Sequence, residues 1–204
     1  SIYEISGHLG KITSIAISND FFISASNDSK IKVWRKIDGS LVKVIEGHSA
    51  AVSALSVHNN MLISGADDAA VKLWDLRQFK LIKQFDLRKK NNTTTNLYDI
   101  AVRDGVAHVT AGYKSGYWGR RYGSYQIDLG SLEMIGENWY MAYDHPVRIY
   151  RGTGISVDAY EDGKIKFKTD KNTKNYNYNL MKNKVVDIDY YDDDKLFVAS
   201  INNI

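Results

Sequence analysis

Residues 7–34 read GHLGKITSIAISNDFFISASNDSKIKVW, and residues 47–74 read GHSAAVSALSVHNNMLISGADDAAVKLW. The Gly-His pair, an internal aspartate (Asp28 and Asp68) and the closing tryptophan all recur 40 residues apart (47−7, 68−28 and 74−34). A period of this length is typical of repeat proteins, in which a unit too small to bury its own apolar face stacks on its neighbours. The repeat therefore governs how the rest of the chain is interpreted.

Each unit contains four short runs of apolar and β-branched residues. In the first unit these runs cover residues 12–17, 22–23, 31–33 and 41–45. Short β-branched runs bounded by polar turn residues predict strands. Four strands in every 40 residues predict an all-β chain built from four-stranded antiparallel blades, which is the architecture of a β-propeller.

The ends of the two units connect this pattern to a known family. The second unit ends in Trp74-Asp75, whereas the first ends in Trp34-Arg35. A unit that runs from a Gly-His pair to a terminal Trp-Asp pair resembles the WD40 repeat, and the resemblance is specific over residues 7–86. The resemblance implies a rigid propeller platform that assembles other proteins and has no chemistry of its own, most often with seven blades in the ring.

The resemblance also implies a hydrogen-bonded network inside each blade, because buried indole and imidazole nitrogens need polar partners. Ser, His and Asp together would also fit the triad of a hydrolase. A nucleophile is needed once in a pocket, however, and has no reason to recur in every structural unit. We therefore expect no catalytic residue and assign these side chains to two structural networks: His8, Ser24, Asp28 and Trp34 in the first blade, and His48, Ser64, Asp68 and Trp74 in the second.

The later sequence keeps the strand pattern but loses the Gly-His motif. We predict one WD40-like propeller domain, whole or partial, over residues 1–204. We expect this chain to be a fragment of a seven-bladed ring with further blades outside the sequence; a five-bladed ring closed by residues 1–6 is the alternative. The predicted blades cover residues 7–46, 47–86, 97–137 and 139–181, with part of a fifth at 184–204 and the outer strand of a neighbouring blade at 1–6.

Composition excludes several classes of function. With 27 basic and 24 acidic side chains the net charge is +3, so no class of charged partner follows from it. The chain has no cysteine, which excludes a disulfide framework and a thiolate metal site. It contains no run of about 18 apolar residues and no apolar leader, so neither a membrane span nor a signal peptide is predicted. We expect an intracellular protein, cytoplasmic or nuclear, without a metal, a cofactor or a small-molecule substrate.

The most irregular stretch is residues 113–125, YKSGYWGRRYGSY. We expect it to be an enlarged turn, because the corresponding turns of the first two units, at 27–30 and 67–70, are short. Such insertions map to one face of a propeller, often the binding face, and Tyr, Trp and Arg are enriched at interface hot spots. The alternative is a longer hairpin whose aromatic side chains pack on the next blade while the arginines are solvated. Arginines beside aromatic residues would also fit RNA, through phosphates and stacked bases.

The resemblance further implies a peptide-binding face, built from the turns that carry the Gly-His pair and the turn aspartate, and it supplies the candidate contact positions in the first two blades. Their mixed charge and polarity favour a protein or peptide partner. We therefore predict a non-catalytic scaffold or adaptor in a multi-subunit complex, such as the substrate-binding module of a ubiquitin ligase. The alternative is a component of an RNA–protein particle that contacts RNA through residues 113–125. The candidate partner-binding residues are Lys11, Thr13, Asn27, Ser53, Asp67, Tyr113, Tyr117, Trp118, Arg120, Arg121, Tyr122 and Arg148, with Ala51 beside Ser53.

Overall fold

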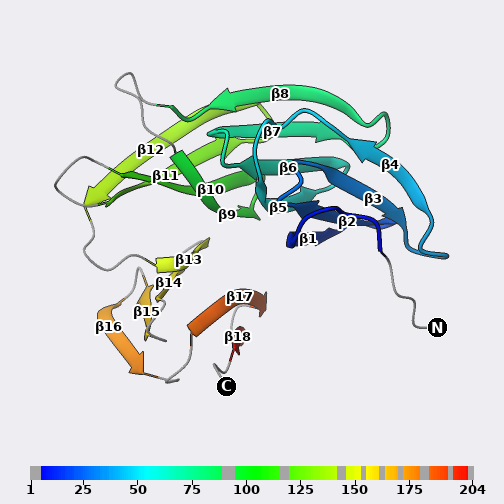
Figure 1. The fold of residues 1–204 in the computed structure, drawn as a ribbon. Coiled ribbons are helices and arrows are strands. Elements are labelled where there is room, and N and C mark those ends of the chain that lie inside the picture. The colour runs from blue at the N-terminus through cyan, green and yellow to red at the C-terminus, as the bar shows by residue number, and fades with distance from the viewer. Residues whose placement is uncertain are drawn as a thin grey trace. The chain divides into compact units, whose positions relative to one another are not determined.

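The structure, a computed structural model, consists of β-strands joined by turns (Figure 1). It describes residues 6–88, 95–114, 120–141, 146–152, 155–160, 164–169, 172–179, 184–192 and 195–201, with side chains for 6–88, 96–112 and 123–137. The chain forms two compact units, residues 1–140 and 141–204. Throughout the described residues every regular element is a strand, which confirms the predicted all-β class.

The first two sheets are successive copies of one meander, in which each strand pairs with the next. Sheet order is β1-β2-β3-β4 in the first blade and β5-β6-β7-β8 in the second. The strands are β1 (Ile12–Ile17), β2 (Phe21–Ser26), β3 (Ile31–Arg35), β4 (Leu41–Ile45), β5 (Val52–His58), β6 (Met61–Ala66), β7 (Ala70–Asp75) and β8 (Lys80–Asp86).

The later sheets repeat the same order although the Gly-His motif is gone. A third blade comprises β9 (Thr95–Arg103), β10 (Val106–Lys114), β11 (Arg120–Asp128) and β12 (Glu133–Met141). A fourth comprises β13 (Pro146–Gly152), β14 (Ile155–Tyr160), β15 (Lys164–Thr169) and β16 (Asn172–Asn179), and β17 (Lys184–Asp192) pairs with β18 (Lys195–Ile201). Four-stranded antiparallel blades are thus confirmed. That residues 1–204 act as one domain, the size of the ring, and an outer strand at 1–6 stay predictions.

The core of the unit formed by residues 1–140 lies between neighbouring blades. Strand β5 contacts β1 and β2, and β9 contacts β5 and β6. Between blades 1 and 2, Ile23 and Val33 lie in one apolar cluster with Val52 and Leu62. Between blades 2 and 3, the corresponding cluster is formed by Ile63, Val71, Leu73, Leu97, Ile100, Val109 and Ile127. Each blade therefore buries its face on the next one, which is the physical reason for the repeat.

Gly65 in β6 shows how closely the second and third blades approach. A Cβ atom at this position would lie 2.4 Å from Leu97 Cδ1, far inside van der Waals contact. The side chain of Leu97 is buried, so the glycine makes room for it. Full burial of a leucine side chain contributes about 2 kcal/mol.

Candidate functional site

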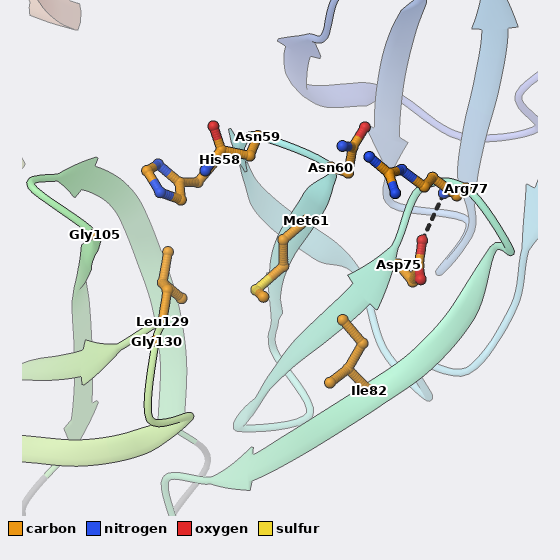
Figure 2. Close-up of a pocket in the computed structure, with 10 residues that line it drawn as sticks. All are labelled: His58, Asn59, Asn60, Met61, Asp75, Arg77, Ile82, Gly105, Leu129 and Gly130. Carbon is orange, nitrogen blue, oxygen red and sulfur yellow. Dashed lines mark hydrogen bonds between the residues drawn. The ribbon is translucent and has the colours of Figure 1, made fainter.

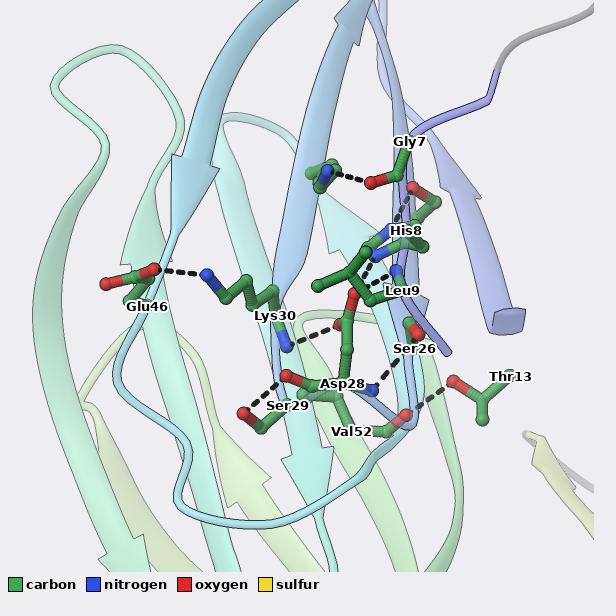
Figure 3. A network of polar contacts seen from close by, with 12 residues as sticks. Gly7, His8, Leu9, Thr13, Ser26, Asp28, Ser29, Lys30, Glu46 and Val52 are labelled. Carbon is green, nitrogen blue, oxygen red and sulfur yellow. Dashed lines mark hydrogen bonds and ion pairs between the residues drawn. The ribbon is translucent and has the colours of Figure 1, made fainter. Parts of the chain in front are cut away.

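The first blade carries a continuous hydrogen-bonded network that starts at the Gly-His pair (Figure 3). His8 Nδ1 lies 2.9 Å from Asp28 Oδ2, and His8 Nε2 lies 2.8 Å from Ser24 Oγ. The indole Nε1 of Trp34 donates to the same Ser24 hydroxyl at 2.9 Å. The structure thus brings together all four residues that the sequence assigned to this blade.

The second blade repeats the network with the same atoms. His48 Nδ1 lies 2.9 Å from Asp68 Oδ2, and His48 Nε2 lies 2.8 Å from Ser64 Oγ. Trp74 Nε1 donates to Ser64 Oγ at 2.8 Å. The backbone amide of Ser49 donates to Asp68 Oδ2 at 3.0 Å, which ties the Gly-His turn to the turn between β6 and β7.

Proton placement explains why this Ser-His-Asp arrangement is structural. An ionised aspartate only accepts hydrogen bonds, so His48 Nδ1 donates to Asp68, and in the tautomer assigned on that basis Nε2 accepts from the Ser64 hydroxyl. The Ser64 oxygen in turn accepts the indole N–H of Trp74 and is fully buried. A nucleophilic serine needs a free oxygen facing a substrate, whereas this one is enclosed by its own partners.

The electrostatics of the two aspartates follow from the same contacts. Burial alone would raise the pKa of Asp68, but hydrogen bonds from His48 and from the Ser49 and Ala70 amides outweigh it and lower the pKa to about 2. Burial would likewise raise the pKa of Asp28. Hydrogen bonds from His8 and from the Leu9 and Lys30 amides outweigh burial and lower this pKa to about 2. Both carboxylates are therefore ionised at neutral pH and hold the histidine rings in place.

Each network has a fifth member, a lysine that was not among the residues predicted from the sequence. Lys32 Nζ donates to the carbonyl oxygen of Gly7 at 2.5 Å, and Lys72 Nζ donates to that of Gly47 at 2.5 Å. Both lysines precede the tryptophan by two residues, so the 40-residue period carried the signal. Gly47 has φ +152°, and a Cβ there would lie 2.9 Å from the Trp74 ring, which explains the glycine of the Gly-His pair.

The predicted contact residues of blades 1 and 2 lie at the Gly-His end of their sheets. The amide of Asn27 donates to the carbonyl of Lys11 at 3.0 Å, and the amide of Asp67 donates to that of Ala51 at 2.9 Å. The side chains of Lys11, Asn27 and Asp67 are exposed. These three residues, which we call the rim, therefore present one cation, one amide and one carboxylate to solvent.

The other two predicted contact residues in these blades make internal contacts. Thr13 Oγ1 donates to the carbonyl of Val52 in the next blade at 2.5 Å, and Ser53 Oγ donates to Asp67 Oδ1 at 3.4 Å. The partial burial of the Asp67 carboxyl, whose outer side faces solvent, raises its pKa, although hydrogen bonds from Ser53 and the Leu97 amide oppose the rise. Thr13 thus joins the blades through its hydroxyl, and Ser53 supports the rim.

Most of residues 113–125 lie in strands, so the prediction of an enlarged turn is wrong for them and the backbone follows the alternative, a longer hairpin. Tyr113 pairs with Arg121 and Lys114 with Arg120, so β10 and β11 form a hairpin of two nine-residue strands. Tyr125 is buried, and its hydroxyl donates to the carbonyl of Leu87 at 3.4 Å, so it belongs to the core. A long ladder needs strand residues on both sides, and aromatic residues favour strands. The side chains of Tyr113, Tyr117, Trp118, Arg120, Arg121, Tyr122 and Arg148 lie outside the described residues.

In the part of the chain that the structure describes, no group of three or more His, Cys, Asp or Glu side chains is arranged to hold a metal ion. In the same residues, no helix has the length and apolarity to cross a membrane.

The comparisons with known proteins agree with this geometry. A search of curated proteins gave no match. The crystal structure of the computationally designed Ika4 protein is similar in fold, with a TM-score of 0.61 and 22% sequence identity, over 81% of this chain and 95% of the designed one. A family model described as "tRNA methyltransferase TRM82 WD40 domain" matches residues 4–117, more than half of the chain. The chain belongs to this family of WD40-repeat domains.

Proposed function

We propose that this chain is a non-catalytic WD40 scaffold in a protein assembly that methylates tRNA. WD40 domains serve in general as platforms for protein interaction, and the family that matches this chain is named for a tRNA methyltransferase. The observation that carries the proposal is that match over residues 4–117. The methyl-transfer chemistry is assigned to a partner subunit.

The buried networks support a scaffold role for the chain. In both blades the serine hydroxyl is hydrogen-bonded to the histidine and to the tryptophan, and the other ring nitrogen of the histidine is hydrogen-bonded to the aspartate. The rim formed by Lys11, Asn27 and Asp67 offers groups of mixed charge, which favours a protein surface over a uniformly charged polymer. The proposal includes an intracellular location, because tRNA is modified inside the cell.

The test is co-purification of the tagged chain with a tRNA-methylating subunit. Replacing the three rim residues by alanine should reduce recovery of that subunit by roughly ten-fold or more, as expected when interface contacts are lost. A matched control replaces three exposed residues of the outer strands, Lys43, Lys80 and Gln84, by alanine and should leave recovery unchanged. Recovery of complexes without tRNA-methylating activity, by both the unchanged chain and the control, would refute the proposal.

Direct RNA contact through residues 113–125 is the second candidate. The family that matches this chain is named for an enzyme that acts on tRNA, and this stretch contains Arg120 and Arg121 next to aromatic residues. Binding of tRNA by the isolated chain that falls steeply with salt, and that is lost on Arg120→Glu with Arg121→Glu, would favour it. Salt-insensitive retention of a protein partner by the same double variant would favour the scaffold. The ubiquitin-ligase assignment stays a prediction.

A further inference from the structure

The repeat makes it possible to compare equivalent crevices between neighbouring blades. At the end of the sheets away from the Gly-His turns, two aromatic rings fill the crevice between blades 1 and 2. Phe21 begins β2 and Phe79 lies in the turn between β7 and β8, with ring centroids 5.8 Å apart in an edge-to-face contact. Both rings pack on the core cluster shared by these two blades.

The crevice between blades 2 and 3 has smaller side chains at the same positions. Met61 stands 40 residues after Phe21 and pairs with Asp75 across β6 and β7, as Phe21 pairs with Arg35 across β2 and β3. Leu132 stands at the position of Phe79. In blade 2 the Leu76 amide donates to the carbonyl of Asn60 at 2.8 Å, and Phe79 follows three residues later. In blade 3 the Leu129 amide donates to the carbonyl of Gly105 at 2.8 Å, and Leu132 follows three residues later. Leu132 and Phe79 also share a left-handed backbone, with φ 57° and 54°.

The exchange of two rings for two aliphatic side chains coincides with an open pocket of about 510 Å³ in that crevice (Figure 2). A volume of this size suits a side chain or a small ligand. Met61, Ile82 and Leu129 form its apolar walls, and Ile82 is 42% exposed. The complete lining is His58, Asn59, Asn60, Met61, Asp75, Arg77, Ile82, Gly105, Leu129 and Gly130.

Internal contacts hold both sides of the crevice in place. Lys83 Nζ, from the outer strand of blade 2, donates to the carbonyl of Leu132 in blade 3 at 2.5 Å. At the mouth of the pocket, Asp75 Oδ1 accepts from the Arg77 amide at 2.7 Å. The side-chain amide of Asn60 is oriented with its oxygen toward Arg77, and this oxygen accepts from Arg77 Nη2 at 2.9 Å. Because these contacts tie the two blades and fix the turns, the crevice is preorganised to receive a ligand.

We propose that this pocket receives one aromatic side chain from a protein partner. The occupant is inferred from the neighbouring crevice, where the chain itself supplies a phenylalanine ring against the position that Met61 occupies here. A methionine thioether makes favourable contacts with aromatic rings. The polar groups at the mouth of the pocket can bind the peptide groups on either side of the inserted residue. This inference names a class of partner and therefore rests on the proposed scaffold function.

The test titrates N-acetylphenylalaninamide into the full chain labelled with ¹³C at the methionine methyl groups. Ring currents from a bound phenyl group should move the Met61 methyl signal in a saturable way, with a Kd of about 1 mM for one side chain. The Met134 methyl group, on β12, is absent from the pocket lining and should not move. N-acetylleucinamide is the second probe. A saturable response of equal affinity to both probes, or no saturable response to either, overturns the proposal.

Two reciprocal substitutions locate the site. Leu132→Phe restores the ring that the first crevice has and should weaken probe binding at least about ten-fold, while Met61 remains as the reporter. Phe79→Leu changes the equivalent position in the other crevice and should leave the Met61 response unchanged. Ile82→Glu provides a second test if Leu132→Phe fails to fold, since Ile82 is half-exposed and a charge there should also abolish the response. An undiminished Met61 response in a folded variant of either kind overturns the proposal. None of these results depends on tRNA methylation, so the two proposals can fail separately.

Discussion

Blades 1 and 2 carry the same motif but meet different surroundings. Their hydrogen-bonded networks are alike, because the side chains of both histidines are almost completely buried within their own blades. Their innermost strands differ: Ile15 in β1 is 64% exposed, whereas Leu55, 40 residues later in β5, is 7% exposed and packs against blade 1. The comparison shows that the network stabilises a blade from within, while the value of an apolar face depends on what covers it.

The largest expected effect on stability distinguishes the equivalent positions Ile15 and Leu55. Leu55→Ala should lower the free energy of unfolding by about 3 kcal/mol, because it removes buried methyl groups and leaves a cavity between two blades. Ile15→Ala should change the same free energy by less than about 0.5 kcal/mol, since most of the side chain already contacts solvent. Urea unfolding followed by tryptophan fluorescence measures both, as all four tryptophans lie in residues 1–140. Equal losses at the two sites would show that β1 is covered as β5 is.

The second prediction concerns the serines at the centre of the networks. Ser64→Ala leaves the Trp74 indole N–H and His48 Nε2 without their partner and should cost about 2 kcal/mol. Ser24→Ala should cost the same to within about 0.5 kcal/mol, because its contacts agree with those of Ser64 to within 0.1 Å and do not depend on a neighbouring blade. The same urea titrations measure both values. A much smaller loss at Ser24 would mean that blade 2 gains its network stability from blade 1.

The third prediction is a dependence of stability on acid. The pKa of Asp68 is about 2 in the folded chain against an ordinary 3.8, so its contribution is complete above about pH 4 and is lost as the pH falls toward 2. The difference corresponds to about 2 kcal/mol at neutral pH. Unfolding titrations of Asp68→Asn and the unchanged chain between pH 5 and pH 2, with Asp20→Asn as an exposed control, should show a shallower slope only for Asp68→Asn. An unchanged slope in that variant would contradict the assigned contacts.

The fold could be predicted from the sequence because the 40-residue period is kept at the residues that form the buried hydrogen-bonded network. The equal spacing of Gly-His, Asp and Trp in the two units indicated the network, since the polar atoms of these side chains form all of their hydrogen bonds in only one arrangement. Lys32 and Lys72 recur at the same spacing but were overlooked, because a lysine in a strand is usually a solvated surface residue.

The candidate site was less predictable than the fold. Tyr125 looked like part of a surface segment because composition alone cannot tell which side of a strand faces the core. The pocket beside Met61 is not visible in one repeat at all. In its crevice Met61 and Leu132 stand where Phe21 and Phe79 stand in the neighbouring crevice, and these positions come together only when two blades are stacked.

The smallest expected effect concerns an ion pair that the two blades do not share. Lys30 Nζ lies 2.8 Å from Glu46 Oε1 in blade 1, and Ala70 stands at the position of Lys30 in blade 2, where Asp86 pairs with Arg88. The Glu46 partner raises the pKa of Lys30 and Lys30 lowers that of Glu46, but both groups are solvated and their attraction is screened. Glu46→Ala should therefore leave the urea midpoint unchanged within error, at both low and high salt. A lower urea midpoint at low salt that returns to the unchanged chain's value at high salt would contradict this expectation. It would show that the exposed ion pair stabilises blade 1, whereas blade 2 is stabilised by its neighbouring blade.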